Sequence, residues 1–428
     1  MADESLVKSI FDLEEFKGYA NEFQARKNRF ARYWRYYKAE ITHAGEWQTM
    51  MGQYIGTFIK NQVMPIFTPL SRAVELDVAL IPGDWQLKPD SQGYQEAIDQ
   101  VFEWGKWDCE GDIFVRFVTA LGEGGLRVVD DRLNKRTFPQ AVRPDTYLAI
   151  ATSNWDDRPK MLISLSRDGE DEIAEVIEPT RVRTFVNGQA MGINGNEASY
   201  ANPLGMVPFV VCKLDAGDGM GEPTFDNTLP SLDQVNRQAT YMSTIISRHA
   251  EPQWAAIGAE AGDLHKDGEA VWFFPEGSDV KAILAQVDFE GLLKFIQEIK
   301  AEMKDSLPEL ALSKLVGVER VAAATIELQM AEAVFKIRRL RKPCDRALRD
   351  ALGIAGGAAK QMGLTDLAVL ADGKWKFDKN RPVISLDALT RLQIENAQRT
   401  NQMSQLTLER EQLLLAASKG EEILTNEQ

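Results

Sequence analysis

The sequence predicts an α+β protein that is mainly helical, with a β-rich module set among helical stretches. Apolar residues recur every three or four positions over long stretches, the longest of them Arg320–Met362, which is typical of helices with one buried face. Between residues 112 and 212, short apolar runs alternate instead with turn clusters such as Asn187-Gly188, which is typical of antiparallel hairpins. A length of 428 residues fits roughly two or three domains, or one elongated subunit with several lobes.

The composition is that of an ordinary soluble globular protein, with 44% hydrophobic and 26% charged residues. No apolar run approaches the roughly 18 residues of a membrane-spanning helix, so we expect none. The acidic start, Met1–Ser5, has no apolar signal core. The three cysteines, Cys109, Cys212 and Cys344, lie far apart and fit no metal-binding spacing, which favours a reducing cytoplasm.

The formal net charge of -15 limits how this chain could bind DNA. Proteins that grip free DNA are usually basic, because neutralisation of phosphates drives their affinity. An acidic chain therefore argues against a repressor-like grip on DNA. It is compatible with a conduit, which repels phosphate on average and so lets DNA slide.

The motifs of common enzymes are missing from the sequence. Gly105-Lys106 lacks the upstream glycine of a phosphate-binding loop, and Gly122–Gly125 fails the dinucleotide-binding spacing and predicts a β-turn. The histidines are too separated to suggest a zinc site, and no catalytic triad has supporting context. We therefore expect no enzyme, cofactor or metal site, although a metal-dependent nuclease built on acidic loops such as Asp130-Asp131 stays open.

The N-terminal 45 residues predict an amphipathic helical region in which aromatic and basic residues alternate. The favoured interpretation is a helix that packs its aromatic residues inward and leaves a solvated basic face. The alternative is a nucleic-acid surface with aromatic stacking. The aromatic residues are Phe16, Tyr19, Phe23, Phe30, Tyr33 and Tyr37, and the basic ones are Arg26, Lys27, Arg29, Arg32, Arg35 and Lys38.

Strands of the β-rich module are predicted from its apolar runs. These runs are Ile113–Ala120, Leu126–Val129, Tyr147–Thr152, Met161–Leu165, Ile173–Ile177 and Val182–Val186. The segment Asn202–Val210, with the sequence NPLGMVPFV, closes the module.

Two amphipathic helices follow, joined by a short mixed segment. The first is expected at Ser231–Ala250, with Pro230 ahead of it and Ser231 and Gln234 as a capping box. The second is expected at Asp288–Asp305 and could pack on the first as an antiparallel hairpin. The tip between them contains two candidate strands, Trp254–Ile257 and Val271–Phe274.

A loop, Ser306–Glu319, leads into the long helix, which has a proline inside it. Pro343 removes a backbone donor, so we expect a kink near Arg339–Lys342. The basic cluster at this point favours a solvated or subunit-bridging face, and a DNA-facing role is the alternative. Gly356-Gly357 and Gly363 are expected to end the helix, and a last helix is expected from Ser385 to about Ser418.

This order of elements resembles the central region of the portal proteins of tailed bacteriophages, in which a stem helix, a clip, a second stem helix, a tunnel loop and a long kinked helix follow one another. Asn202–Val210 resembles the junction before the first stem helix. Glu319–Glu327 resembles the start of the kinked helix, except that Ala and Thr are not where that pattern has them. The resemblance implies a wing at 1–228, stem helices at 229–252 and 288–305, a clip at 253–287, a tunnel loop at 306–319, a kinked helix at 320–363 and a crown or tail at 364–428.

The same resemblance implies a function without catalysis. The chain would form a ring, a dodecamer in that family, at a unique capsid vertex, and would be a conduit for packaging and ejection of double-stranded DNA. Its partners would be the terminase large subunit, head-completion and tail adaptor proteins, and the major capsid and scaffolding proteins. It would be assembled in the host cytoplasm, without a membrane. A virion protein without a channel, such as a tail adaptor or minor capsid protein, is the alternative.

The resemblance also assigns candidate site residues, which fall into four groups. The DNA-facing tunnel loop would present Leu312, Lys314, Leu315, Val316 and Arg320. The stem interface between subunits would use Val235, Met242, Ile246, Leu292, Ile296 and Ile299. The docking surface of the clip would use Trp254, Trp272, Phe273 and Phe274, and the kink would lie at Arg339, Arg341, Lys342 and Pro343.

Overall fold

The structure is a computed structural model. It describes residues 9–40, 67–82, 85–151, 158–193, 197–214, 219–250, 253–257, 279–283, 289–310 and 330–383. The chain divides into two compact units, which we call the body and the arm. The body comprises Met1–Trp34, Leu70–Thr224 and Leu307–Gln428, and the arm comprises Arg35–Pro69 and Phe225–Ser306.

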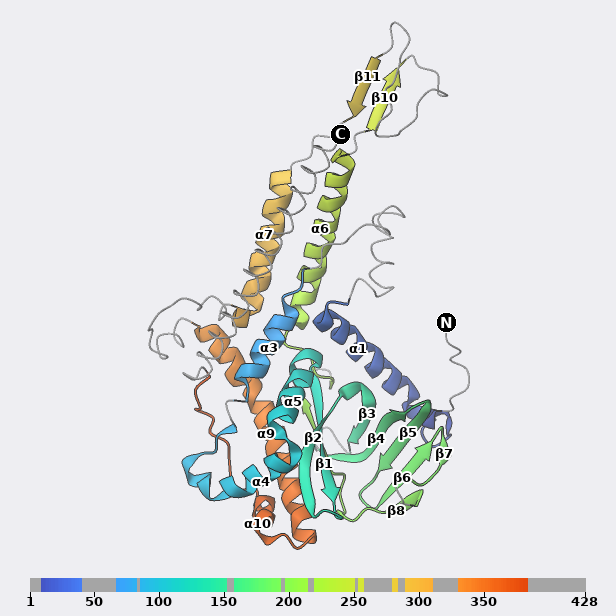
Figure 1. The fold of residues 1–428 in the computed structure, drawn as a ribbon, viewed down its shortest axis with the longest axis vertical. Coiled ribbons are helices and arrows are strands. Elements are labelled where there is room, and N and C mark those ends of the chain that lie inside the picture. The colour runs from blue at the N-terminus through green and yellow to red at the C-terminus, as the bar shows by residue number, and fades with distance from the viewer. Residues whose placement is uncertain are drawn as a thin grey trace, which may run out of the picture. The chain divides into compact units, whose positions relative to one another are not determined.

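The body is built around two antiparallel sheets (Figure 1). In the smaller sheet, β1 (Glu123–Asp131) lies between β2 (Arg136–Val142) and β9 (Phe209–Lys213). The larger sheet has the order β3-β4-β5-β6-β7, with β8 also paired to β6. Its strands are β3 (Tyr147–Ala151), β4 (Pro159–Asp168), β5 (Asp171–Ile177), β6 (Arg181–Val186), β7 (Gln189–Ala190) and β8 (Ser199–Ala201).

The turns of the larger sheet follow from glycine and asparagine. Asn187 and Gly188 both have positive φ angles, 50° and 74°, as the tight turn between β6 and β7 requires. Asn202 holds the later turn, because its side-chain amide donates to the carbonyls of Glu178 and Met206 at 2.7 and 2.8 Å. The segment that the sequence marks as a junction therefore folds as a turn that leads into β9.

Helices cover the smaller sheet on the face opposite the larger sheet. Successive residues of a strand point to opposite faces. A Cβ atom added to Gly124 would lie 2.8 Å from Val118 of α5 (Trp107–Leu121), and one added to Gly125 would lie 2.8 Å from Tyr147 of β3. The strand β1 is thus pressed from both sides. The other helices of the body are α1 (Ala20–Lys38), α3 (Leu70–Leu80), α4 (Gln95–Gly105), α9 (Ala331–Gln361) and α10 (Thr365–Ala368).

Short 3-10 helices connect these elements. They are η1 (Ile10–Asp12), η2 (Lys17–Tyr19), η6 (Pro89–Tyr94), η7 (Pro144–Thr146) and η10 (Val369–Asp372) in the body, and η8 (Asp226–Thr228) in the arm. A further set of residues joins the N-terminal region to the larger sheet. Ile10, Phe16 and Phe23 are buried in one cluster with Leu148 and Ile163, so the inward-packing interpretation of the N-terminal aromatics holds for these side chains.

Two predictions next to α5 are wrong. Ile113–Ala120 was expected as a strand but belongs to α5, where Phe114, Val115 and Val118 are all fully buried. A short apolar run does not distinguish a strand from a buried helix. Gly122–Gly125 was expected as a β-turn, but Gly122 ends α5 with a φ of 81° and Glu123 begins β1.

The long helix α9 ends at Gln361, within one residue of the predicted end at Met362, but Gly356-Gly357 does not end it as expected. The helix continues through Pro343 and past these two glycines. A Cβ atom on Gly356 would lie 2.5 Å from the backbone nitrogen of Ala371. This glycine therefore allows η10 to pack against the helix and does not end it. Gly363, with a φ of 79°, follows the actual end.

A buried ion pair connects α1 to both sheets. Arg26, 6% exposed, donates to both carboxylate oxygens of Glu123, 1% exposed, at 2.5 and 3.3 Å. The hydroxyl of Tyr147 donates to the same carboxylate at 2.9 Å. Burial alone would lower the pKa of Arg26, but the charge and hydrogen bonds of Glu123 raise it. The guanidinium also lies 5.1 Å from the ring centre of Phe30.

The arm is a helix hairpin with a two-stranded sheet. It contains α6 (Leu229–Ala250), β10 (Gln253–Ile257), the antiparallel partner β11 (Asp279–Ile283) and α7 (Phe289–Ser306), and α6 and α7 lie side by side (Figure 1). The predicted strand Val271–Phe274 lies outside the described residues.

The start of α6 differs from the prediction. Because the helix begins at Leu229, Ser231 lies within its first turn and is not the predicted N-cap. Pro230 lies in that first turn, where a missing backbone N–H has no effect on the helix. Further along, Asn236 accepts from the backbone N–H of Phe67 at 2.7 Å and donates to its carbonyl at 3.1 Å, which fixes the chain before α3 onto α6.

We predict that Arg26→Met lowers the free energy of unfolding by about 3–5 kcal/mol, because it leaves the Glu123 carboxylate buried without a counter-charge. Urea unfolding followed by circular dichroism would measure the change. The matched control is Arg181→Met, which breaks the exposed pair with Glu178, where the Arg181 side chain is 50% exposed. That loss should stay below about 1 kcal/mol. Equal losses for the two variants would contradict a special role of the buried pair.

Candidate functional site

The predicted stem interface is divided between buried and exposed side chains. Val235, Ile296 and Ile299 are 0%, 5% and 8% exposed, because α6 and α7 pack them against each other within one chain. They are therefore not open to a neighbouring subunit, contrary to the prediction. Met242 packs at the edge of this cluster, and Leu292 is half-buried.

Apolar side chains of the hairpin that its own packing leaves uncovered lie on both helices. Ile246 of α6 is 50% exposed, and Leu293 and Phe295 of α7 are 45% and 40% exposed. Of these, Ile246 is one of the predicted interface residues, and Phe295 belongs to the apolar stripe that the sequence predicts for the second helix. Leu293 and Phe295 belong to the same apolar-rich helix, but only the packing shows which of its residues point outward.

The predicted tunnel loop and clip lie largely outside the described residues. This holds for Leu312, Lys314, Leu315, Val316 and Arg320, and for Trp272, Phe273 and Phe274. For Trp254 the structure gives its position in β10 but not its side chain.

The two ends of chain that flank residues 311–329 are joined by a buried ion pair. The ammonium of Lys336, on α9, donates to both oxygens of the Glu309 carboxylate at 2.8 and 2.9 Å. Glu309 is fully buried, and Lys336 is 18% exposed in its side chain. Sequence patterns do not predict this pair, because its members lie 27 positions apart.

A second buried carboxylate adjoins this pair. Asp77 of α3 is fully buried. Burial, and then the negative charge of Glu309, raise the pKa of Asp77 to about 8, against the opposing effect of Lys336. The Lys336 ammonium bonds to Glu309 and acts on Asp77 only through its charge, so Asp77 holds a proton at neutral pH. The cluster connects α3, α9 and the residues before position 311.

The basic cluster near Pro343 divides into buried and exposed members. Arg341, 3% exposed, donates from Nε and Nη2 to the carbonyls of Ile81 and Leu80, at 3.0 and 2.7 Å, and so satisfies the C-terminal end of α3. It also donates to the carbonyls of Arg381 and Pro382 at 2.9 and 3.2 Å. Its predicted place on a solvated or DNA-facing surface is therefore wrong. Arg339 and Lys342 are exposed, and Pro343 is half-buried.

Arg381 adds a second buried arginine to this network, at the middle of α9. It is 1% exposed, and it binds the carboxylate of Asp345 through two hydrogen bonds of 2.7 and 2.8 Å. The segment that follows η10 is thus fixed to the middle of the long helix. The two arginines make the surroundings of Pro343 a rigid junction between three stretches of chain.

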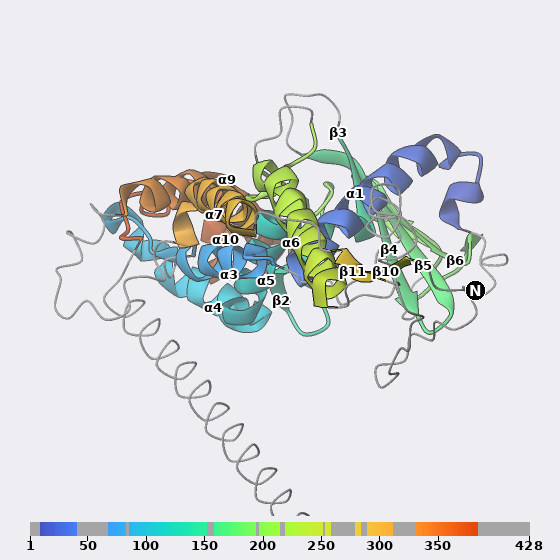
Figure 2. The same ribbon diagram turned by 90° about the horizontal axis from the view of Figure 1, so that it is seen from above.

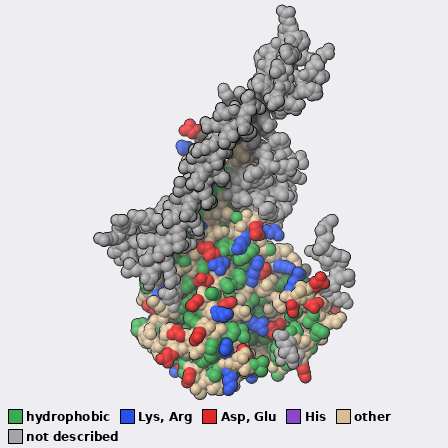
Figure 3. Space-filling model, viewed as in Figure 1, with side chains coloured by type: hydrophobic (Ala, Val, Ile, Leu, Met, Phe, Trp, Pro, Cys, Tyr) green, Lys and Arg blue, Asp and Glu red, His purple; other side chains and the backbone are tan. Residues whose placement is uncertain are grey.

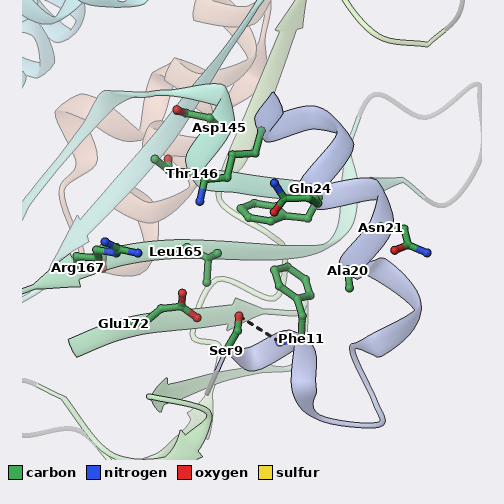
Figure 4. Close-up of a pocket in the computed structure, with 13 residues that line it drawn as sticks. Ser9, Phe11, Ala20, Asn21, Gln24, Asp145, Thr146, Leu165, Arg167 and Glu172 are labelled. Carbon is green, nitrogen blue, oxygen red and sulfur yellow. Dashed lines mark hydrogen bonds between the residues drawn. The ribbon is translucent and has the colours of Figure 1, made fainter. Parts of the chain in front are cut away.

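The body also has a cavity of about 640 Å³ between α1 and the larger sheet (Figure 4). Its lining includes the apolar side chains of Phe11, Phe23 and Leu165, and two cations, Lys27 and Arg167, with two acids, Asp145 and Glu172. The two cations and two acids balance in formal charge. Of these residues, the sequence places Phe23 and Lys27 in the alternative nucleic-acid surface, and it singles out none of them as a predicted site.

Asp130 and Asp131, the acidic residues of the nuclease alternative, make local contacts at the turn between β1 and β2. Asp131 accepts from the backbone and the side chain of Asn134 at 3.2 and 2.7 Å, which lowers the pKa of Asp131, and Asp130 pairs with Arg132 at 2.9 Å. Within the described ranges no three His, Cys, Asp or Glu side chains are grouped to hold a metal ion. In the same ranges no helix is long and apolar enough to cross a membrane.

Comparison with known proteins gives weak structural similarities. No protein-family model and no curated protein matches this chain. The chain is similar to one in the neck of a native gene transfer agent particle computed with C12 symmetry, with a TM-score of 0.41, 12% identity and coverage of 76% of this chain and 87% of that chain. A chain of the virion of that native particle gives 0.42, 12%, 84% and 89%. One from the neck of the empty particle, computed with C6 symmetry, gives 0.39, 13%, 76% and 87%.

We predict that Asp77→Asn changes how stability depends on pH. Because the folded pKa of about 8 exceeds the unfolded value of roughly 4, folding binds a proton between these values and the wild type loses stability as pH rises through them. The variant lacks this loss, so its stability relative to the wild type should rise from pH 5 to pH 8, by at most roughly 1.4 kcal/mol per pH unit. Urea unfolding at pH 5, 7 and 9 would measure it. The exposed Asp366→Asn is the control, and parallel pH profiles for wild type and Asp77→Asn would contradict the assignment.

We also predict that Arg341→Lys lowers the free energy of unfolding by about 2–4 kcal/mol, although the charge is kept. A lysine ammonium does not reproduce the fork of donors, so buried carbonyls of α3 and of the 381–382 segment lose their partners. Lys342→Ala, at the exposed neighbouring position, should change stability by about 0.5 kcal/mol or less. If Arg341→Lys has the same free energy of unfolding as the wild type, the carbonyls must find other donors.

Proposed function

We propose that this chain is a structural protein of a phage-like particle and, more specifically, a portal subunit. Self-assembled copies would form a ring at one capsid vertex, through which double-stranded DNA is packaged and ejected. The observation that supports this most is the arm. Two long amphipathic helices flank a small β-hairpin, in the order that the resemblance to portal proteins implies.

The surface chemistry of the arm favours assembly with further copies. Ile246, Leu293 and Phe295 expose apolar side chains along a hairpin whose inner face is already filled by Val235, Ile296 and Ile299. Apolar surface on a slender hairpin is removed from water when hairpins of neighbouring copies lie side by side. The ring contact that we propose therefore uses these outward side chains, of which the sequence prediction of the interface includes Ile246.

The charge of the chain suits a conduit. With a net charge of -15, a ring of such subunits repels phosphate on average, so DNA inside it would not be held fast. We propose that the tunnel-loop residues, Lys314 and Leu315 among them, face the DNA. We propose also that the clip, with Trp254 and Trp272, is the docking surface for the terminase large subunit and for the adaptor proteins.

Imaging of the purified protein tests the proposal. Negative-stain electron microscopy should show rings with a central hole wide enough for a DNA duplex, and native mass spectrometry should give their subunit number. Filaments or small oligomers without a hole would instead favour a virion protein that forms no channel, such as a tail adaptor or minor capsid protein. Magnesium-dependent DNA cleavage that is lost on replacing Asp130 and Asp131 would favour a nuclease.

We predict that Leu293→Asp combined with Phe295→Asp abolishes ring formation, because each interface would then bury uncompensated charges. The folded subunit should keep its thermal midpoint within a few degrees, since both side chains are already exposed. Leu133→Asp is the matched control, at a position in the body that is 97% exposed. Native mass spectrometry separates the outcomes, and full rings from the double variant would exclude both of these side chains of α7 from the interface.

A further inference from the structure

The exposed cations of α9 form one stripe on the surface of the body. Arg338, Lys342 and Arg346 recur every four residues, Arg339 adjoins them, and all four are exposed. The stripe extends about 12 Å from Arg338 to Arg346 at 1.5 Å per residue. The stripe thus carries four cations on a chain that is acidic overall.

Beside this basic stripe lies an uncovered aromatic side chain. Phe335 is 66% exposed and precedes Arg338 and Arg339 by about one helical turn. Aromatic residues and arginines are enriched where protein surfaces meet. The combination resembles a protein-binding surface more than a purely solvated helix face.

A complementary acidic stripe lies on α4 and the start of α5. Glu96, Asp99 and Glu103 recur at spacings of three and four on α4, and Asp108 and Asp112 continue the stripe on α5, all of them exposed. From Glu96 to Glu103 the stripe extends about 10 Å, close to the length of the basic stripe. Lys106 is the one cation between positions 95 and 112.

Several acids of this stripe lie close enough to affect one another. Burial is the main cause that raises the pKa of Asp112; the charge of Arg116 opposes it, and the charges of Glu75 and Asp108 add smaller increases. In Figure 3 acidic side chains gather on the lower left of the body, over α4.

The two stripes lie on different sides of the same unit. Figure 2 shows α9 along one edge of the helical layer of the body and α4 with α5 along the opposite edge. A surface and its complement at different places on one molecule make head-to-tail contacts, which close into a ring when the rotation between copies allows it.

We propose that the basic stripe of α9 docks on the acidic stripe of α4 and α5 of a second copy of this chain. The match in sign and length of two stripes on one chain favours a second copy over a nucleic acid, which would leave the acidic stripe without a role. The contact deepens the proposed function, because it names a second surface between neighbouring copies. It does not depend on what the assembly encloses.

Charge reversal with mutual rescue tests the contact. One variant combines Arg338→Glu with Lys342→Glu, and the other combines Asp99→Lys with Glu103→Lys. Each alone should self-associate about tenfold or more weakly than the wild type in sedimentation velocity at low salt. A 1:1 mixture of the two variants should associate again, because the reversed stripes are complementary to each other, and the chain with all four changes should associate with itself.

Matched controls separate the contact from general effects of charge. Lys160→Glu makes the same reversal at an exposed position of β4 and should leave association unchanged. Wild-type association should weaken as ionic strength rises from about 0.05 to 0.5 M, because screening shortens the reach of exposed charges. Circular dichroism would verify that every variant is folded.

Three results would overturn the proposal. One is a wild type that stays monomeric at all protein and salt concentrations. Another is association that persists when only one stripe is reversed, or that does not return when the two variants are mixed. The third is unchanged association with weakened binding of a DNA duplex, which would make the stripe a nucleic-acid surface. If both charge-reversal variants still form rings, this contact is refuted and the portal proposal stands. If the wild type forms filaments that the charge reversals disrupt, the contact is supported and the portal proposal is refuted.

Discussion

The ion pair between Arg26 and Glu123 is the constraint on which the body depends. Removing two charges from water is costly, and their attraction offsets the cost only when the geometry is good and the remaining polar atoms are bonded. Glu123 meets this condition with the two arginine contacts and the Tyr147 hydroxyl. Any other position of α1 would leave this carboxylate buried and unpaired, so the N-terminal helix has one place to lie.

The same pair explains why β1 is the central strand. Glu123 is followed by Gly124 and Gly125, and a side chain at either position would collide with α5 or with Tyr147 and Phe209. The strand can therefore be covered closely on both faces while it also pairs with β2 and β9. Elements far apart in the sequence converge on these three residues, which makes them the junction of the two sheets, α1 and α5.

How much the sequence predicts depends on whether the signal is local. The hairpin turn at Asn187-Gly188 and the helices near α6 and α7 were predicted close to their observed bounds, because turn residues and periodicity act within a few positions. The role of Arg341 was not predicted, because its carbonyl partners lie on α3 and beyond residue 380. Sequence spacing does not show which distant residues come into contact. The inward-facing residues of α9 include Ile337, Arg341 and Cys344, and its outward-facing residues include Arg338 and Lys342. The basic residues of this run therefore lie in two different environments, the interior and the surface.

For the candidate site the same limit applies to the arm. Periodicity correctly marks an apolar stripe on each helix, but it does not say whether the partner of that stripe belongs to the same chain or to another. Val235, Ile296 and Ile299 find theirs within the chain. Only the packed hairpin shows which apolar residues, Leu293 and Phe295 among them, are left for a different surface.

The Glu309–Lys336 pair has a consequence for how this fold could vary over evolution. Glu309 is fully buried, so a substitution that removes the Lys336 ammonium leaves its carboxylate inside the body without a counter-charge. A change at one of the two positions is therefore best tolerated together with a change at the other, such as a joint replacement of both by apolar side chains. We expect the two positions to covary among homologous chains, although they lie far apart in the sequence.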